Sequence, residues 1–337
     1  MSTLRPPQCR WFFRTLSLES DVSNINQDEI VITGAGGAIG RQLVTALLYK
    51  GFNLVLNYFT EAEIPHELHN KKNIRIVVGD ISKYEILKKS INKDCCIVHL
   101  ATTVDPALYT GKLVNGFVDS FNSTLPLLDY LKESSYKVHL IFPSSGGTVY
   151  QDSNKPHLEH EYVCGSSVYG ISKLTLENQI LLLCRHNPHL TANILRISNP
   201  YGMSLAKNRK QGFIDIALQK IIDGEDVEIW SDLQIIRDYV HYEDLNQAFI
   251  KALQYRSGAE IFNIGSGKGY SLSDIIEFMR ILFNREVNTR FCHSPCTNTY
   301  PLCNVLNINK ATDILGYYPQ IDIKSGLLKA YKEKGGC

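Results

Sequence analysis

The chain has 337 residues, and its net charge is only +1 because 35 Lys and Arg residues balance 34 Asp and Glu residues. This balance argues against nucleic acid or an anionic membrane as a partner held through bulk charge. With 44% hydrophobic and 20% charged residues, the composition is that of a globular protein of about two domains. No apolar stretch approaches the roughly 18 residues that span a membrane. The nine scattered cysteines are typical of free thiols in a reducing cytoplasm. We therefore expect a soluble, cytoplasmic protein.

The first 28 residues differ from the rest of the chain. Arg5, Arg10 and Arg14 precede any acidic residue, and residues 11–13 form the only apolar cluster. No periodicity develops, so we expect a flexible N-terminal extension. A transit-type peptide is the alternative interpretation.

From residue 29 short apolar runs alternate with stretches of helical spacing. The runs predict strands at residues 30–32, 53–56, 74–78, 96–100, 138–142 and 192–197. The intervening stretches predict helices, among them 82–91, 113–131 and 168–184. Such alternation folds as a doubly wound parallel sheet with helices on both faces. After about Asn199 the alternation loosens, as expected of a smaller C-terminal lobe.

A glycine-rich turn stands between the first strand and the first helix. Residues 33–40 read Thr-Gly-Ala-Gly-Gly-Ala-Ile-Gly, which places Gly34, Gly37 and Gly40 at three-residue intervals. Glycine permits a tight turn and brings main-chain N–H groups and a helix N-terminus against a pyrophosphate. Its place in the first strand–helix unit favours a dinucleotide-binding site over a purely structural turn.

The ends of the second and third strands carry polar residues. Asn57 stands where an acid would normally bind the adenosine ribose; it offers a hydrogen bond but no charge. Because no Arg or Lys adjoins it to hold a 2′-phosphate, NAD is favoured over NADP. Asp80 closes the third strand and either contacts the adenine or caps the helix that follows Ser82.

Tyr169 and Lys173 are four residues apart and therefore share one face of a helix. An ammonium near a phenol, together with an oxidised nicotinamide, lowers a tyrosine pKa from about 10 toward neutrality and makes a usable general base. A hydroxyl from the strand end at residues 143–145 would orient the same substrate oxygen for hydride transfer.

With these motifs the sequence resembles the extended short-chain dehydrogenase/reductase family, and within it the sugar-nucleotide 4-epimerases of the UDP-glucose 4-epimerase kind. The resemblance runs from about residue 30 to residue 319. It rests on the glycine turn, on Tyr169 with Lys173, and on the stretches Ser-Ser-Gly-Gly-Thr-Val-Tyr (144–150), Arg-Ile-Ser-Asn-Pro-Tyr-Gly (196–202), Arg-Asp-Tyr-Val-His (237–241) and Phe-Asn-Ile-Gly-Ser-Gly (262–267).

The resemblance implies a Rossmann-like domain over 29–199, rejoined at about 238–265, and a substrate-binding lobe over 200–237 and 266–337. It implies Tyr169 as acid/base, with Lys173 on the nicotinamide ribose. The cofactor-binding residues expected are Gly34, Gly37, Ala38, Ile39, Gly40, Asn57, Asp80, Ile81, Leu100, Ala101, Tyr169 and Lys173. The substrate-binding residues expected are Ser145, Thr148, Asn199, Phe213, Arg237 and Cys303.

Among these, Asn199 and Arg237 would hold the nucleotide diphosphate, since a planar, permanently charged fork suits that group. The alternative for Arg237 is an ion pair with Asp238 or Asp244. Residues 211–214, which include Phe213, would wrap the nucleotide base.

The chain departs from the family pattern at three positions. Gly146 replaces the catalytic Ser or Thr, so the hydroxyl must come from Ser145, Ser144 or Thr148, and we favour Ser145. Residues 147–148 lack the Asp-Glu pair of the 4,6-dehydratases, which disfavours dehydration. Cys296 stands at the second diphosphate-binding Arg position.

Cys303 is a small side chain where the family limits the substituent at sugar C2, which leaves room for an N-acetyl group. Together with Cys292, His293 and Cys296 it also suggests a zinc site, but the spacing is loose and we favour a thiol-containing loop without metal. His99 and His241 are expected to be structural.

We therefore expect NAD-dependent 4-epimerisation of a nucleotide-activated, UDP-linked hexose or N-acetylhexosamine through a transient 4-keto sugar. The alternatives are an NAD(P)H-dependent 4-ketosugar reductase and a Rossmann dinucleotide sensor without turnover. Family resemblance also implies a homodimer formed through helices 113–131 and 168–184.

Overall fold

The computed structural model describes residues 28–69, 71–102, 113–203, 212–284, 286–292 and 301–335. Seven parallel strands form the main sheet in the order β10-β6-β5-β4-β1-β2-β3. The strands are β1 (Glu29–Thr33), β2 (Asn53–Tyr58), β3 (Ile74–Val78), β4 (Cys95–His99), β5 (Val138–Ser145), β6 (Leu190–Ile197) and β10 (Ala259–Ile264). The doubly wound parallel sheet expected from the alternation is thus confirmed, and the chain returns to it through β10.

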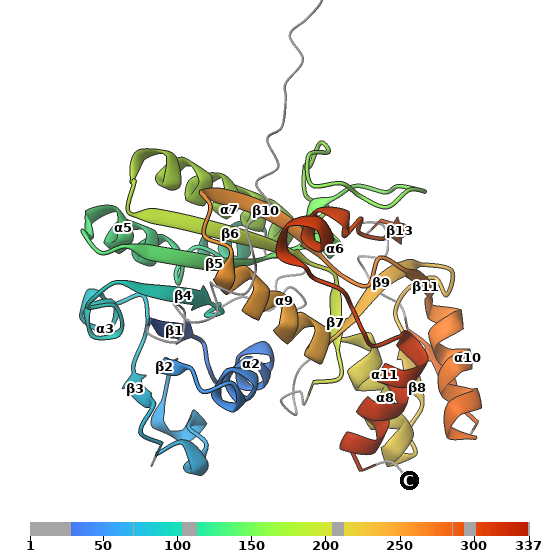
Figure 1. Ribbon diagram of the computed structural model, residues 1–337. Coiled ribbons are helices and arrows are strands. Elements are labelled where there is room, and N and C mark those ends of the chain that lie inside the picture. The colour runs from blue at the N-terminus through green and yellow to red at the C-terminus, as the bar shows by residue number, and fades with distance from the viewer. Residues whose placement is uncertain are drawn as a thin grey trace, which may run out of the picture.

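Helices cover both faces of this sheet (Figure 1). Side chains alternate along β1, so Ile30 and Ile32 enter one core and Val31 enters the other. The first core receives α2 (Ala38–Tyr49), α9 (Tyr242–Gln254) and a short π-helix, Ala311–Leu315. The second receives α3 (Tyr84–Ser90), α5 (Leu125–Glu133) and α7 (Val168–His186).

The single helix expected over residues 113–131 is wrong, because the structure has two. α4 (Leu113–Asp119) ends in a run of turns, and α5 begins at Leu125 with Pro126 in its first turn. A proline inside a continuous helix would lack an N–H donor and clash with the carbonyl four residues earlier, whereas the first turn tolerates it.

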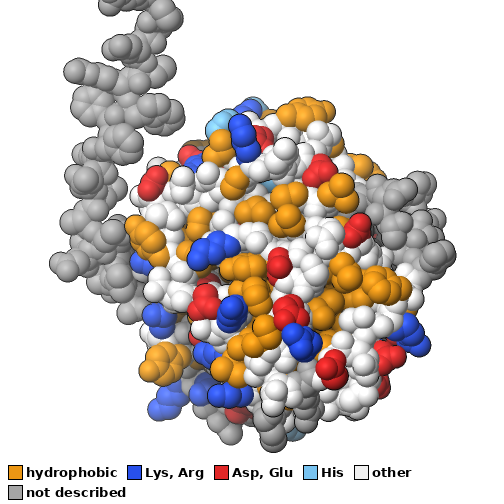
Figure 2. Space-filling view, turned by 90° about the vertical axis from the view of Figure 1, so that its right-hand side faces the viewer, with side chains coloured by type: hydrophobic (Ala, Val, Ile, Leu, Met, Phe, Trp, Pro, Cys, Tyr) orange, Lys and Arg blue, Asp and Glu red, His pale blue; other side chains and the backbone are white. Residues whose placement is uncertain are grey.

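The smaller part of the molecule has its own core. Its strands are β7 (Asn199–Tyr201), β8 (Val227–Ile229), β9 (Ile236–His241), β11 (Gly269–Ser271), β12 (Thr289–Phe291) and β13 (Cys303–Asn304). Its helices are α8 (Phe213–Asp223), α10 (Leu272–Phe283) and α11 (Ile323–Glu333). The rings of Phe283 and Tyr331 stack at 3.9 Å in this core. Figure 2 shows the side that includes α10, where exposed hydrophobic side chains lie among charged ones.

Within the described ranges, no helix is long and apolar enough to cross a membrane. The expected N-terminal extension lies outside the described residues except for its last residue, Asp28. The side chain of Asp28 pairs with Arg256 at 2.7 Å, just after α9.

Candidate active site

The glycine-rich turn lies against the end of β4, and the packing leaves no room for side chains. Gly34 has φ +67°, and a Cβ there would lie 2.7 Å from the Ala101 nitrogen. A Cβ at Gly40 would lie 2.5 Å from the Gly34 carbonyl oxygen. Both positions therefore require glycine, which keeps the turn bare for a ligand.

The N-terminus of α2 is suited to an anion. Its N-cap, exposed Gly37, has no side-chain cap, and the first turn holds no acidic residue. The first N–H groups of a helix, here those of Ala38, Ile39 and Gly40, lack intrahelical acceptors and carry the positive end of the helix dipole. The bare turn and these donors fit the pyrophosphate of a dinucleotide.

Asn57 lies at the end of β2 as expected, but its amide hydrogens are used inside the sheet. Nδ2 donates to the carbonyls of Val77 (3.3 Å) and Gly79 (3.0 Å), and only 3% of the residue is exposed. Asp80 does not cap α3, whose N-cap is Lys83; its Oδ1 instead accepts the Ser82 N–H at 2.9 Å.

Asp80 lines an open groove of about 710 Å³, whereas its neighbour Ile81 is buried. Phe117, Phe121 and Asn122 also line it. The groove offers apolar walls and polar groups near the end of the third strand.

His99 fixes the start of the segment that holds Leu100 and Ala101. Its Nδ1 is 2.8 Å from the Thr33 hydroxyl, and its Nε2 is 3.0 Å from the Thr124 hydroxyl. The Leu100 N–H donates to the Thr33 carbonyl, and the Ala101 N–H to the Thr33 hydroxyl. Burial, with the nearby charge of Lys173, lowers the pKa of His99 to about 3. The neutral imidazole therefore has a structural role, as expected.

Tyr169 and Lys173 project from the first two turns of α7, which Ser167 caps by accepting the Gly170 N–H. Lys173 Nζ donates to the Pro143 carbonyl at 3.0 Å and lies 5.5 Å from the centre of the Tyr169 ring. Burial lowers the pKa of Lys173 to about 8, although the charge of Glu177 opposes the shift. The structure thus brings the phenol and the ammonium together at the end of β5.

A buried polar cluster lies beneath this pair. Glu177, one turn after Lys173 on α7, accepts a hydrogen bond from the Ser144 hydroxyl and pairs with Arg196 at 2.7 Å. Arg196 in turn donates to the Tyr150 hydroxyl at 2.9 Å. Sequence reasoning missed Glu177 and assigned Arg196 no role; the spacing of four from Lys173 placed an acid on the same helix face.

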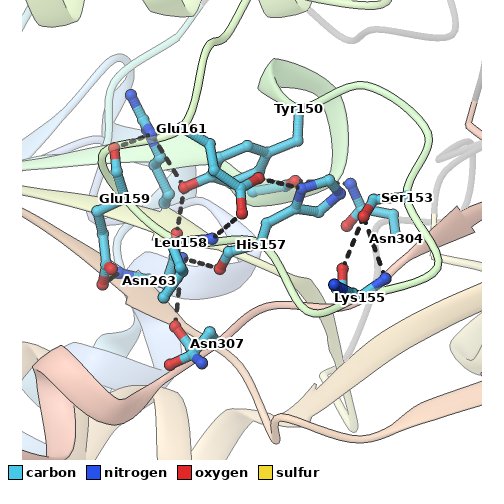
Figure 3. Close-up of polar contacts among 12 residues, drawn as sticks. Tyr150, Ser153, Lys155, His157, Leu158, Glu159, Glu161, Asn263, Asn304 and Asn307 are labelled. Atoms are coloured by element: carbon cyan, nitrogen blue, oxygen red, sulfur yellow. Dashed lines mark hydrogen bonds and ion pairs between the residues drawn. The ribbon is translucent and has the colours of Figure 1, made fainter.

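The cluster continues into the segment between α6 (Gly146–Val149) and α7. The Tyr150 ring stacks on the His157 ring at 4.5 Å, and its hydroxyl donates to Asn263 at 2.7 Å (Figure 3). Glu161 Oε2 lies 2.9 Å from Nδ1 of the His157 imidazole. Asn263 Nδ2 donates to the His157 carbonyl at 2.8 Å, so β10 is tied to this segment.

The structure explains why Gly146 carries no hydroxyl. A Cβ there would lie 2.6 Å from Leu306 Cδ1 and 3.1 Å from the Arg196 carbonyl oxygen, and Leu306 is fully buried. The Ser144 hydroxyl is held by Glu177. Of the expected alternatives, this leaves Ser145 at the strand end and Thr148, whose buried hydroxyl has no partner among the described residues.

Three of the expected substrate residues, Asn199, Arg237 and Cys303, lie on β7, β9 and β13. Asn199 Nδ2 donates to the Asp238 carbonyl at 2.9 Å, and Arg237 donates to the carbonyl of its neighbour Ile236 at 2.8 Å. Cys303 on β13 pairs in register with Ile236 on the neighbouring strand β9. It therefore lies one residue before Asn304, which pairs with Arg237.

The two acids considered as partners of Arg237 have other contacts. Asp238 accepts the N–H groups of Ser266 (2.7 Å) and Gly267 (3.1 Å), and Asp244 accepts those of Gln320 and Ile321, both at 2.9 Å. These carboxylates therefore anchor loops.

Several expected residues stand apart or cannot be placed. Phe213 begins α8 and packs against the core of the smaller part. Its neighbour Gln211, as well as His293 and Cys296, lies outside the described residues. Among the residues that are described, no group of three or more His, Cys, Asp or Glu side chains could hold a metal ion.

Known proteins resemble this chain over most of its length. The model of the family described as "NAD dependent epimerase/dehydratase family" matches residues 30–265. The dTDP-4-dehydro-6-deoxyglucose reductase of Escherichia coli is 29% identical over 317 residues, covering 90% of this chain and 96% of that protein. A putative UDP-glucose 4-epimerase of Methanocaldococcus jannaschii is 28% identical over 312 residues, covering 88% and 95%.

Among solved structures, the UDP-glucose 4-epimerase of Thermotoga maritima with UDP-glucose has a TM-score of 0.80 at 23% identity. The match covers 90% of this chain and 97% of that one. At this identity the likeness shows a shared fold, which extends through both the main sheet and the smaller part.

Proposed function

Because the chain belongs to the NAD dependent epimerase/dehydratase family, with NAD as its cofactor, we propose that it interconverts C4 epimers of a nucleotide-linked hexose. UDP-glucose and UDP-galactose, or the corresponding N-acetylhexosamines, are the candidate substrates. The observation that carries the proposal is the placement of Tyr169 and Lys173 beside the end of β5, with Lys173 Nζ held on the Pro143 carbonyl.

In this mechanism the Tyr169 phenolate removes the proton from the sugar C4 hydroxyl, and the resulting phenol returns it to the C4 oxygen after the 4-keto sugar has rotated to present its other face. The Lys173 ammonium favours the phenolate of Tyr169. The Ser145 hydroxyl orients the C4 oxygen, and Thr148 is the alternative donor. When bound, NAD supplies the reversible hydride acceptor that this route requires. The glycine turn and the start of α2 hold its pyrophosphate.

The nucleotide end of the substrate lies near β9 and β13 in this proposal. Arg237 supplies the diphosphate with a planar cation, and Asn199 supplies an amide. Cys303, on the strand next to Arg237, leaves space at sugar C2 because its side chain is small. The N-acetylhexosamines therefore belong in the substrate panel.

The test is incubation of the purified chain with UDP-hexoses and UDP-N-acetylhexosamines, with chromatographic separation of the C4 epimers. We expect interconversion without added nicotinamide. Tyr169→Phe should lower kcat by about 10²- to 10⁴-fold. The proposal fails if no epimer forms from any substrate, which would revive the sensor hypothesis. The assignment of Tyr169 fails if Tyr169→Phe leaves epimerisation unchanged.

A 4-ketosugar reductase is the second candidate, and the similarity to the Escherichia coli reductase over 96% of that protein favours it. The same Tyr169 and Lys173 would then protonate a 4-keto oxygen. This enzyme would consume reduced nicotinamide stoichiometrically when given a dTDP-4-keto-6-deoxyhexose. Absorbance at the reduced nicotinamide band separates the two candidates.

We also propose that the chain forms a homodimer through α4 and α7, which contact each other. Exposed apolar side chains on these helices support this, among them Val118 (53% exposed), Ile171 (44%) and Leu182 (47%). Sedimentation velocity should show a dimer, and the double variant Val118→Asp with Leu182→Asp should sediment as a monomer. A monomeric unsubstituted chain would contradict the proposal.

A further inference from the structure

The adenosine end of the cofactor site lacks the ribose acceptor that its sequence position would predict. Asn57 is 3% exposed, and its amide hydrogens join β2 to the carbonyls of Val77 and Gly79. Little of this side chain is therefore available to a ligand. Another group near the end of β2 must bind the ribose hydroxyls if the cofactor is held there.

A carboxylate from the next segment lies at this place. Glu63 closes the 3₁₀ turn Glu61–Glu63, and its Oε2 accepts the Phe59 N–H at 3.2 Å, which turns the side chain back toward β2. The same oxygen is 3.1 Å from the point that a Cβ on Gly36 would occupy. Glu63 is exposed, so a ligand on the glycine turn can reach it.

We propose that Glu63 binds the adenosine ribose hydroxyls and makes this chain selective for NAD over NADP. A carboxylate accepts both hydroxyl protons in charge-assisted hydrogen bonds. A 2′-phosphate at the same place would bring a second anion against it and lose those bonds. Glycine at position 36 lets the carboxylate lie close to the turn, because a Cβ there would be only 3.1 Å from Glu63 Oε2.

The charges around the end of β2 have both signs. Burial raises the pKa of Tyr58, which follows Asn57, to about 12, and the negative charges of Glu67 and Glu63 add to the rise. The positive charge of Arg41 acts in the opposite direction. An arginine is therefore close to the end of β2 after all, although it comes from α2 and not from the neighbouring residues of the strand.

Selectivity can be measured without any sugar substrate. The purified chain is equilibrated with an equimolar mixture of NAD⁺ and NADP⁺ in large excess, freed of unbound nucleotide and denatured. Chromatography of the released nucleotide then gives the bound ratio. Because no turnover is involved, the result stands whether the enzyme is an epimerase or a reductase.

We expect the ratio of bound NAD to NADP to fall by about tenfold or more in Glu63→Gln, since a hydrogen bond to a charged group is lost and a repulsion is removed. Glu63→Asp, which keeps the charge on a shorter side chain, should retain more of the discrimination than Glu63→Gln. Glu61→Gln removes the same charge two residues away and should leave the ratio within about twofold.

An unchanged ratio in Glu63→Gln would overturn the proposal. An equal fall in Glu61→Gln would also overturn it, because selectivity would then come from the general negative field of the segment. Circular dichroism of each variant checks that the fold is intact. Glu63 is exposed, and its side chain accepts a hydrogen bond from the Phe59 N–H.

Discussion

Lys173 Nζ donates a 3.0 Å hydrogen bond to the Pro143 carbonyl, which joins the second turn of α7 to the end of β5. The ammonium also lies 4.7 Å from the centre of the Phe142 ring. These contacts fix the cation beside Tyr169 from the strand side. The position of the pair therefore depends on how α7 packs on the sheet as well as on the spacing along the helix.

The charge of Lys173 should limit activity at high pH. Burial lowers its pKa to about 8 despite Glu177, so the folded enzyme loses this ammonium as the pH rises through about 8. The phenolate of Tyr169 then loses its stabilising cation, and kcat/KM should fall on the alkaline side. A pH–rate profile from pH 6 to 10 measures this. Lys173→Arg keeps its charge over this pH range, so the variant should have a lower kcat/KM but no alkaline fall. An alkaline fall equal to that of the unsubstituted chain would contradict the assignment.

Glu177→Gln should strongly destabilise the fold. It leaves Arg196 buried without its counter-ion, and breaking one side of such a pair costs about 3–5 kcal/mol. Urea unfolding followed by circular dichroism gives the value. Glu277→Gln, which removes an acid from an exposed pair with Arg280, is the matched control and should show no resolvable change. Equal midpoints for the two variants would show that the buried pair adds little.

Gly146→Ala should reduce stability because the new methyl group meets Leu306 Cδ1 and the Arg196 carbonyl. Overpacking of this kind costs about 1–3 kcal/mol. Gly147→Ala is the control, since its nearest neighbour would be Asn199 Oδ1 at 3.8 Å. Leu306→Ala creates a cavity of its own, so the double variant should be more stable than the sum of the single losses predicts. Additive losses would rule out the contact.

His99 should make the protein sensitive to acid. Its pKa is about 3 in the folded state against an ordinary value near 6.5, so below pH 6.5 the unfolded chain takes up a proton that the folded chain does not. The free energy of unfolding then falls by about 1.4 kcal/mol per pH unit until the pH approaches the pKa of His99 in the folded state. His99→Gln should be less stable at pH 7 but have a shallower slope between pH 6.5 and 4. Equal slopes in urea unfolding would contradict this.

Local features of the chain were sufficient for much of the fold. Apolar runs placed six strands of the main sheet to within about three residues, because strand formation follows short-range alternation and hydrophobicity. Pro126 marks the break in the sequence, but the helical spacing of the apolar residues on both sides of it predicted one continuous helix. The prediction that the chain returns to the main sheet depended on the family resemblance and not on periodicity. The strand concerned is β10, which joins the sheet next to β6.

The sequence by itself determined the glycine turn and the spacing of Tyr169 and Lys173, because both are set by backbone geometry over a few residues. Only the tertiary structure decided which polar atoms meet. In the folded chain the Asn57 amide donates its hydrogen bonds within the sheet, and Glu63 lies beside the glycine turn. Leu306 lies where a side chain at position 146 would be. Such contacts join segments that are distant in the chain, and their partners are chosen by the packing of whole elements, which no local pattern records.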